Sequence, residues 1–305
     1  MTLPTPVLVT GAQGFLGRAL VRSLQARGAE VRGIDDLSAP GARDSPRFPS
    51  LIVGNVEEVG TLPQLTSGVQ AVVHLAARDV PPEAPVEGYR SNVLGTLSLL
   101  RAATAAGVPR IVLASDASVY GNAGAPPFSE QRVLGPVGLR GAAYAARELL
   151  GRTYAERGPS QVVALRLFHV YGRGRRGSHH PGILTRFGEE IAAGRPPQVP
   201  GTGELARDFL HVDDAVDAFE RALERRVGRW TVVNVGTGVP VTIRDAAELA
   251  CEALGRPDLE PVSVDPSRDP TVSSFADVRS ARTVLGLEAK VSLAEGLARR
   301  DWFLP

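Results

Sequence analysis

The chain has one cysteine and one lysine among its 305 residues, so several kinds of chemistry are excluded before any motif is considered. A single Cys251 excludes an internal disulfide and a thiolate metal cluster, and it fits a reducing compartment. Because Cys251 lies in an apolar helical pattern, we expect it to pack in the core. Lys290 is the only lysine, so no earlier segment can contribute a lysine to an active site.

Neither an excess of one charge nor a long apolar run is present. The 34 basic and 33 acidic side chains nearly cancel, so no basic surface predicts nucleic acid as the main partner. The N-terminus has no basic segment followed by an apolar core, and no window approaches the roughly 18 apolar residues of a membrane span. We therefore expect a cytoplasmic protein that binds neither nucleic acid nor membrane.

Short β-branched runs alternate with longer amphipathic segments, which is typical of βαβ units and a parallel sheet. The first unit has a strand at 6–10, a helix at about 14–27 and a strand at 30–34. Further strands are expected at 70–75, 110–115, 161–168 and 231–236. The pattern predicts an α/β fold with a doubly wound, Rossmann-like parallel sheet, in which ligands bind at the carboxyl ends of the strands.

The alternation weakens beyond about Tyr171, where glycine, proline and arginine become frequent before a final set of helices. We assign residues 1–170 to a dinucleotide-binding domain, to which segments near 205–238 return. Residues 171–305 are expected to form mainly a smaller C-terminal substrate-binding part. Length alone is compatible with one intertwined unit or with two modest domains.

A glycine-rich turn follows the first expected strand directly. The spacing of Gly11, Gly14 and Gly17 permits a tight turn and lets backbone amides approach a pyrophosphate at the N-terminus of the next helix. Asp35 follows the second strand about 20 residues later, where a carboxylate accepts hydrogen bonds from both ribose hydroxyls and repels a 2′-phosphate. The pattern predicts NAD rather than NADP. The alternatives are a glycine turn used for packing and an aspartate in a solvated turn.

Several separated motifs occur in a fixed order along the chain. They are VTGAQGFLG at 9–17, HLAA at 74–77, NVLGT at 92–96, SDASVYG at 115–121, LRLFHVYGRG at 165–174, RDFLHVDD at 207–214 and NVGTG at 234–238. With these motifs the chain resembles the extended short-chain dehydrogenase/reductase superfamily, specifically its NAD-dependent nucleotide-sugar epimerases and dehydratases, over essentially its whole length. The resemblance implies bound NAD, a nucleoside diphosphate sugar as substrate and a homodimer.

The resemblance also assigns cofactor contacts to matching positions. These are Gly11, Gly14, Phe15, Leu16, Gly17, Asp35, Asn55, Val56, Leu75, Ala76, Ala77 and Asn92. Asn55 replaces an aspartate that is usual in the family. Its amide can still donate and accept hydrogen bonds at the adenine, so the departure is mild.

On the substrate side, the resemblance and the chemistry of the side chains point to Ser118, His169, Arg176 and Arg207. The alternatives are a structural role for Ser118 and a polar residue at a strand end for His169. His169 replaces an asparagine common in the family, and Arg207 is expected to contact the diphosphate through its guanidinium group. Arg176 belongs to a loop rich in arginine and histidine that we expect to bind an anion, with a solvated loop as the alternative. The two adjacent histidines of this loop have no companion cysteine or spaced carboxylate, so no metal site is expected.

One helical segment resembles the family's catalytic helix, approximately P-x-S-x-Y-G-x-S-K-x-x-x-E, but lacks its reactive residues. Pro136, Gly141 and Glu148 align with family landmarks. Arg140 then stands at the tyrosine position and Tyr144 at the lysine position. A second register that begins at Tyr144 places Glu148 at the lysine position, so neither register contains a lysine.

Asp116 stands where family members carry the serine or threonine that bonds the reacting sugar oxygen, so all three reactive positions are substituted. Arg140 remains charged and can stabilise an oxyanion, but it cannot readily act as a base. Asp116 can accept a proton, although a close pair with Arg140 would lower its pKa and weaken it as a base. Tyr144 lies one helical turn from Arg140, on about the same face. We predict that these three residues replace the family's catalytic residues and support a different reaction. The alternative is that the site has lost its catalytic activity.

The sequence is compatible with three functions. The first is an NAD-dependent nucleotide-sugar-modifying enzyme of epimerase, dehydratase or ketoreductase type with atypical acid/base residues. The second is a non-redox isomerase, lyase or cyclase on the same scaffold, in which Asp116 or Tyr144 moves protons. The third is a catalytically silent, nucleotide-binding regulatory protein.

Overall fold

The computed structural model describes residues 3–39, 41–58, 60–78, 85–174, 182–265 and 272–303. Seven parallel strands form the main sheet: β1 (Val7–Thr10), β2 (Val31–Asp35), β3 (Leu51–Val53), β4 (Ala71–His74), β5 (Arg110–Asp116), β6 (Gln161–Leu167) and β11 (Trp230–Val235). Their order is β11-β6-β5-β4-β1-β2-β3. The strand order reverses between β1 and β4, as in a doubly wound sheet, so the predicted α/β, Rossmann-like fold is confirmed.

Every strand of this sheet except β3 is predicted by the sequence. Most residues of the predicted strands are buried, although the edge strand β11 is only partly buried at its start, and the strands are rich in β-branched residues. β3 has three residues, lies at the edge of the sheet and is half exposed, so its pattern is too short to be recognised.

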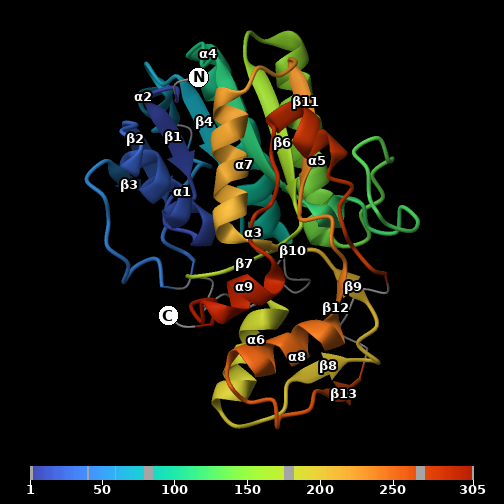
Figure 1. Cartoon of the computed structure of the whole chain (residues 1–305). Helices are drawn as coiled ribbons and strands as arrows, with labels where there is room; N and C mark the ends of the chain where they lie inside the picture. Colours follow the sequence, from blue (N-terminus) through green and yellow to red (C-terminus); the bar gives the residue numbers. More distant parts are fainter. Residues whose placement is uncertain are drawn as a thin grey trace.

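Helices cover both faces of the sheet (Figure 1). One face is covered by α1 (Phe15–Ala26) and α7 (Val212–Glu224), which bury leucine, valine and phenylalanine side chains against it. The other is covered by α2 (Leu62–Thr66), α4 (Thr96–Ala105) and α5 (Leu139–Arg157). Before α4 the chain forms α3 (Pro85–Tyr89) and a π-helical turn, η1 (Arg90–Gly95). The two apolar layers are separate clusters, because successive strand residues alternate between the faces.

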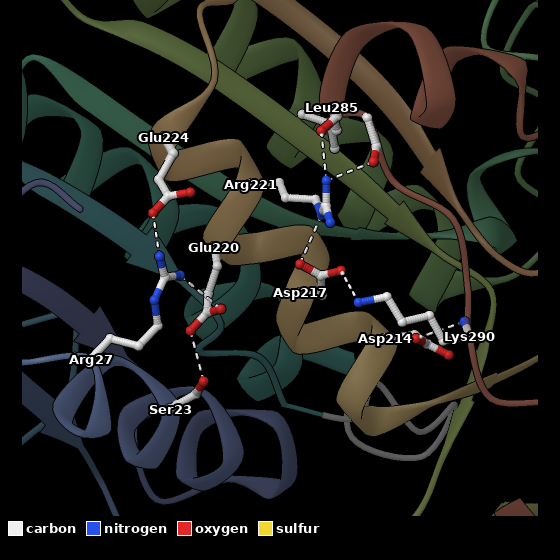
Figure 2. Close-up of polar contacts among 10 residues, drawn as sticks. Ser23, Arg27, Asp214, Asp217, Glu220, Arg221, Glu224, Leu285 and Lys290 are labelled. Atoms are coloured by element: carbon white, nitrogen blue, oxygen red, sulfur yellow. Dashed lines mark hydrogen bonds and ion pairs between the residues drawn. The ribbon is translucent and has the colours of Figure 1, made fainter. Parts of the chain in front are cut away.

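Helix α7 comes late in the chain but packs against the first helix, α1 (Figure 2). Arg27, at the end of α1, lies 2.9 Å from Glu220 and 2.5 Å from Glu224. Further along α7, Asp214 accepts the backbone N–H of Lys290 at 2.9 Å. Polar contacts thus hold α7 against α1, and the chain near Lys290 against α7, on the side of the molecule that contains the main sheet.

A smaller lobe lies beyond the carboxyl ends of the strands (Figure 1). Its elements are α6 (Ile183–Ala192), β8 (Gln198–Pro200), α8 (Ile243–Ala253) and β13 (Val262–Val264), and it borders β7 (His169–Tyr171), β9 (Ala206–Arg207), β10 (Phe209–His211), β12 (Val241–Thr242) and α9 (Leu293–Ala298). Cys251 is buried in the apolar core of this lobe, as predicted. A π-helical turn, η4 (Ala281–Leu285), returns to the main sheet beside β11.

Candidate functional site

The glycine-rich turn between β1 and α1 is packed too closely for a side chain at two of its glycines. Gly11 has a φ of +67°, and a Cβ there would lie 2.7 Å from the nitrogen of Ala76. A Cβ on Gly17 would lie 2.0 Å from the carbonyl oxygen of Gly11, so both positions require glycine. Gly14 is the N-cap of α1 and supplies no side chain, which leaves the first helical amides open to a phosphate.

Asp35 ends β2 beside this turn and is buried. One of its carboxylate oxygens accepts the N–H of Gln13 at 2.8 Å, and the other accepts that of Leu37 at 2.7 Å. Burial raises the pKa of the Asp35 carboxyl, and these two N–H bonds oppose the rise. Each oxygen retains a further lone pair, so the carboxylate fits a pair of ribose hydroxyls.

A line of buried polar groups runs from β1 through β4 to the start of α4. His74 Nδ1 lies 2.7 Å from the Thr10 hydroxyl, and Nε2 lies 2.9 Å from the Thr96 hydroxyl. Because Thr96 donates its proton to the Asn92 carbonyl at 2.7 Å, it must accept from Nε2–H, and Nδ1 accepts from Thr10. Burial, together with the charge of Arg147, pushes the pKa of His74 well below its usual value. The imidazole is therefore neutral and held in one tautomer.

Asn92 holds the chain that follows β4. Its carboxamide accepts the N–H of Arg78 at 2.8 Å and donates to the Arg78 carbonyl at 2.8 Å. The Arg78 side chain forms an ion pair with Asp36 at 2.5 Å. Since β1 lies between β2 and β4 in the sheet, this ion pair links the loops on the two sides of the glycine-rich turn. Asn92 thus fixes the backbone next to Ala77, at the edge of the predicted cofactor site.

The other predicted cofactor residues surround the same edge of the sheet. Phe15 and Leu16 begin α1, and Leu75, Ala76 and Ala77 follow β4. Asn55 forms a local turn, in which its amide oxygen accepts the Glu57 N–H at 3.1 Å. Val56 is buried against Gly95. Direct contact of Asn55 with the adenine remains a prediction.

Asp116, Arg140 and Tyr144 lie together where β5 ends and α5 begins. Arg140 Nη2 is 2.9 Å from Asp116 Oδ2, and its guanidinium carbon is 5.2 Å from the centre of the Tyr144 ring. Asp116 caps a short turn, η2 (Ala117–Val119), by accepting the N–H of Ser118 at 2.9 Å. The three predicted catalytic side chains are therefore one physical cluster, with Ser118 beside it.

The charge of Asp116 is controlled by its partner. Burial would raise the pKa of this carboxyl, but the charge and hydrogen bond of Arg140, with hydrogen bonds from Ser118, outweigh burial and lower the pKa to about 2. At neutral pH Asp116 is an ionised partner of Arg140 and a poor general base. Of the cluster, Tyr144 is the side chain whose hydroxyl can both donate and accept a proton.

A buried network fixes the orientation of α5 behind the cluster. Glu148, one of the family landmarks, accepts bonds from Arg166 at 2.9 and 2.7 Å and from the Ser115 hydroxyl at 2.5 Å. Arg166 also donates to the Tyr120 hydroxyl at 2.9 Å, which donates to Asn234 at 2.6 Å. The network joins α5 to β5, β6 and β11. Glu148 is therefore bonded within the core, and the register that places Arg140 at the family's tyrosine position stays a prediction.

Arg147 is a candidate site residue that the sequence pattern does not single out. It lies on α5 and is 0% exposed. Its Nη1 donates to the Ala114 carbonyl at 2.9 Å and its Nη2 to the Ala76 carbonyl at 2.6 Å, while its guanidinium carbon lies 5.1 Å from the Tyr144 ring centre. The only available signal was an arginine next to the inward-facing Glu148 in an alanine-rich helix.

The structure describes some of the residues that are predicted to bind the substrate. His169 begins β7 and is exposed, with its ring centre 6.1 Å from that of Phe209. Arg207 is buried, and its Nη1 donates to the carbonyls of Ala206 and Val272 at 3.0 Å each. Arg176 and its neighbouring histidines lie outside the described residues. Among the residues described, no three histidine, cysteine or acidic side chains are grouped to hold a metal ion, and no helix is long and apolar enough to cross a bilayer.

Comparison with known proteins gives consistent matches. Residues 7–236 match the family model described as "NAD dependent epimerase/dehydratase family". The chain is 35% identical over 309 residues to UDP-glucose 4-epimerase of Mycolicibacterium smegmatis, with 96% of each protein covered. The solved UDP-glucose 4-epimerase of Thermotoga maritima with UDP-glucose has a TM-score of 0.91 at 29% identity over 97% of each chain. MoeE5 in complex with UDP-glucuronic acid and NAD has a TM-score of 0.84 at 35% identity over 96% of each chain.

Proposed function

The chain belongs to the NAD-dependent epimerase/dehydratase family, and on that premise we propose that it is an NAD-dependent enzyme that modifies a nucleoside diphosphate sugar with atypical acid/base residues. Two solved proteins of similar fold hold UDP-glucose or UDP-glucuronic acid, and one of them also holds NAD. A UDP-hexose or UDP-hexuronic acid is therefore the substrate to test first. The reaction is of epimerase, dehydratase or ketoreductase type.

The residues present fit NAD. Gly11 and Gly17 let the turn pack tightly against the end of β4 and against itself, and the start of α1 carries no side-chain cap that would compete with a phosphate. The Asp35 carboxylate is placed for ribose hydroxyls and disfavours a 2′-phosphate. When bound, NAD supplies a hydride acceptor. The proton transfers and the binding of the sugar must come from side chains near the ends of β4 and β5 and the start of α5.

One observation carries the assignment of roles: Arg140 pairs with Asp116 at 2.9 Å and lies against the Tyr144 ring. The pair is charged on both sides, so it binds and orients a sugar hydroxyl or steadies an oxyanion. Tyr144 gives and takes the hydroxyl proton. On the substrate side we propose that Arg207 contacts the diphosphate, with Ser118, His169 and Arg176 as further contacts.

The test combines a substrate screen with a matched pair of tyrosine variants. UDP-glucose, UDP-galactose and UDP-glucuronic acid are incubated with the protein, and products are identified by NMR. Tyr144→Phe is expected to lower turnover by about 100-fold or more while NAD binding persists. Tyr154→Phe, on the same helix but away from the cluster, is the control and is expected to retain activity. Full activity of Tyr144→Phe would remove Tyr144 from the mechanism.

A silent binding protein is the second candidate, and a specific observation favours it. Asp116 is neutralised by Arg140, and the family's lysine position holds Tyr144. This candidate predicts that NAD and a UDP-sugar bind, but that no sugar in the screen is converted. A non-redox enzyme is distinguished by reducing the bound NAD with borohydride, which abolishes turnover only when the reaction is redox.

We further propose a homodimer formed through α4 and α5 in the cytoplasm. Leu94, Leu97 and Leu149 are 53%, 37% and 62% exposed on η1, α4 and α5, and α4 packs against α5. An apolar surface of this kind suits a second copy. Light scattering should give twice the chain mass, and Leu149→Asp should shift the protein to a monomer.

We also propose that residues 1–170, with α7 and β11, hold NAD, while residues 171–305 supply most of the sugar-nucleotide contacts.

A further inference from the structure

Arg147 is a buried cation that forms no ion pair with any carboxylate in the described part of the chain. Burying a charge in this way is unfavourable unless dipoles or rings compensate. Here the compensation comes from the carbonyls of Ala76 and Ala114 and from the face of the Tyr144 ring. Burial lowers the pKa of Arg147, but a guanidinium is so weakly acidic that the side chain stays charged at neutral pH.

The two carbonyls locate this charge relative to the cofactor site. Ala76 follows β4 and lies against Gly11 of the glycine-rich turn, since a Cβ on Gly11 would be 2.7 Å from the Ala76 nitrogen. Ala114 is in β5, two residues before Asp116. A dinucleotide lies across the carboxyl ends of the strands at the reversal of strand order. Because Asp35 takes the adenosine ribose at β2, the nicotinamide half falls on the β4 and β5 side, with Arg147.

Holding the ends of β4 and β5 together does not by itself explain why a charged residue occupies position 147. Two main-chain carbonyls can be bonded by a neutral amide or by water at a lower desolvation cost. The positive charge does have one consequence that a neutral donor lacks. The positive charge of Arg147 interacts electrostatically with any ligand whose own charge changes at the carboxyl ends of the strands. Because Arg147 is buried, little water screens this interaction.

We propose that Arg147 is a positioning residue whose charge biases the cofactor site toward NADH, because it disfavours the cationic ring of NAD⁺ relative to the neutral ring of the reduced form. The inference rests on the proposed NAD-dependent function. Its consequence is that NAD⁺ held in this site accepts a hydride more readily than it does in water. The chain obtains an internal positive charge on α5 from Arg147, although it has no lysine there.

The test compares the dissociation constants of NAD⁺ and NADH by calorimetry on cofactor-stripped protein. The wild type is expected to bind NADH more tightly. Arg147→Met should shrink the ratio of the two constants about tenfold, which corresponds to about 1.4 kcal/mol. Arg147→Lys keeps the charge and should keep most of the preference. Arg152→Met removes an exposed arginine of the same helix and should leave the ratio unchanged.

The ratio separates a charge effect from a structural one. If Arg147 only fastens the strand ends, its loss weakens both cofactor forms alike and the ratio stays at the wild-type value, which overturns the inference. Arg147→Gln, which retains an amide donor, serves if the methionine variant is unfolded by circular dichroism. Equal affinity of the wild type for NAD⁺ and NADH also overturns the inference and leaves the proposed function intact. Failure of the wild type to bind either form overturns both.

Discussion

The guanidinium of Arg140 lies 2.9 Å from the carboxylate of Asp116, and motif spacing predicts that each of these residues stands where family members carry a reactive group. On that prediction the two substitutions compensate each other, because a carboxylate in place of a hydroxyl is balanced by a guanidinium in place of a phenol. The pair is partly exposed, at 24% for Asp116 and 49% for Arg140, so a ligand can reach it.

The pair gives stability a defined dependence on pH. The pKa of Asp116 is lowered to about 2 in the folded protein, against about 3.9 for an unfolded aspartate. Its contribution is fully present above the unfolded pKa and is lost as the pH falls from about 4 to about 2. Asp116→Asn should cost about 1 kcal/mol or less at pH 7, because exposure screens the pair. Urea unfolding at pH 7, 4 and 2 should show the difference disappearing, and a difference constant with pH would contradict the assignment.

Asp35 should control the choice between NAD and NADP. Asp35→Asn removes the negative charge that repels a 2′-phosphate and weakens the bonds to the ribose hydroxyls. We expect the affinity for NAD to fall roughly tenfold and the preference over NADP to narrow. The control is Asp44→Asn, an exposed aspartate in the loop after β2. Calorimetric titration with both dinucleotides measures the effect, and an unchanged preference would exclude Asp35 from the ribose site.

The ion pair between Arg78 and Asp36 should slow the release of the cofactor. It links the loops on the two sides of the glycine-rich turn, so a bound dinucleotide leaves more easily when the link is broken. Arg78→Met is expected to raise the rate of NAD release about two- to fivefold, as befits a partly exposed pair. Stopped-flow displacement by a fluorescent analogue gives the rate. Arg101→Met, on the exposed side of α4, should leave it unchanged.

Arg166 should matter for stability far more than any surface arginine. Both Arg166 and Glu148 are 4% exposed, so Arg166→Met leaves a buried carboxylate without its partner. We expect a loss of about 3–5 kcal/mol in the free energy of unfolding. Replacing Glu148 with leucine in the same chain should recover part of the loss. Arg152→Met should change stability by less than about 1 kcal/mol, and an equal effect of the two arginines would refute the buried network.

The features that sequence predicts well are local ones. Strands buried on both faces appear as β-branched runs, and Gly11 and Gly17 are required by contacts within one turn and with the end of β4. The grouping of Asp116 with Arg140 follows from motif spacing and from helix periodicity. Each of these depends on residues that are near in sequence or on a pattern that the family shares.

The features that sequence does not predict depend on where strand ends and helix faces meet. Arg147 reaches the carbonyl of Ala76, 71 residues earlier in the chain. Arg78 meets Asp36 across 42 residues. Neither partner carries a local signal, since a backbone carbonyl is present at every residue and one more surface charge resembles any other. These contacts exist because β4, β5 and α5 converge, and convergence is a property of the packed fold.

The late return of β11 and α7 to the main sheet affects the protein as it is being made. When β6 has left the ribosome, one of its edges has no partner strand until residues 230–235 emerge. The apolar side of α1 also stays uncovered until α7 has been synthesised. A growing chain in that interval exposes an unpaired strand edge next to an uncovered apolar layer, which is the combination that favours aggregation. The nascent chain therefore needs protection until β11 completes the main sheet at residue 235.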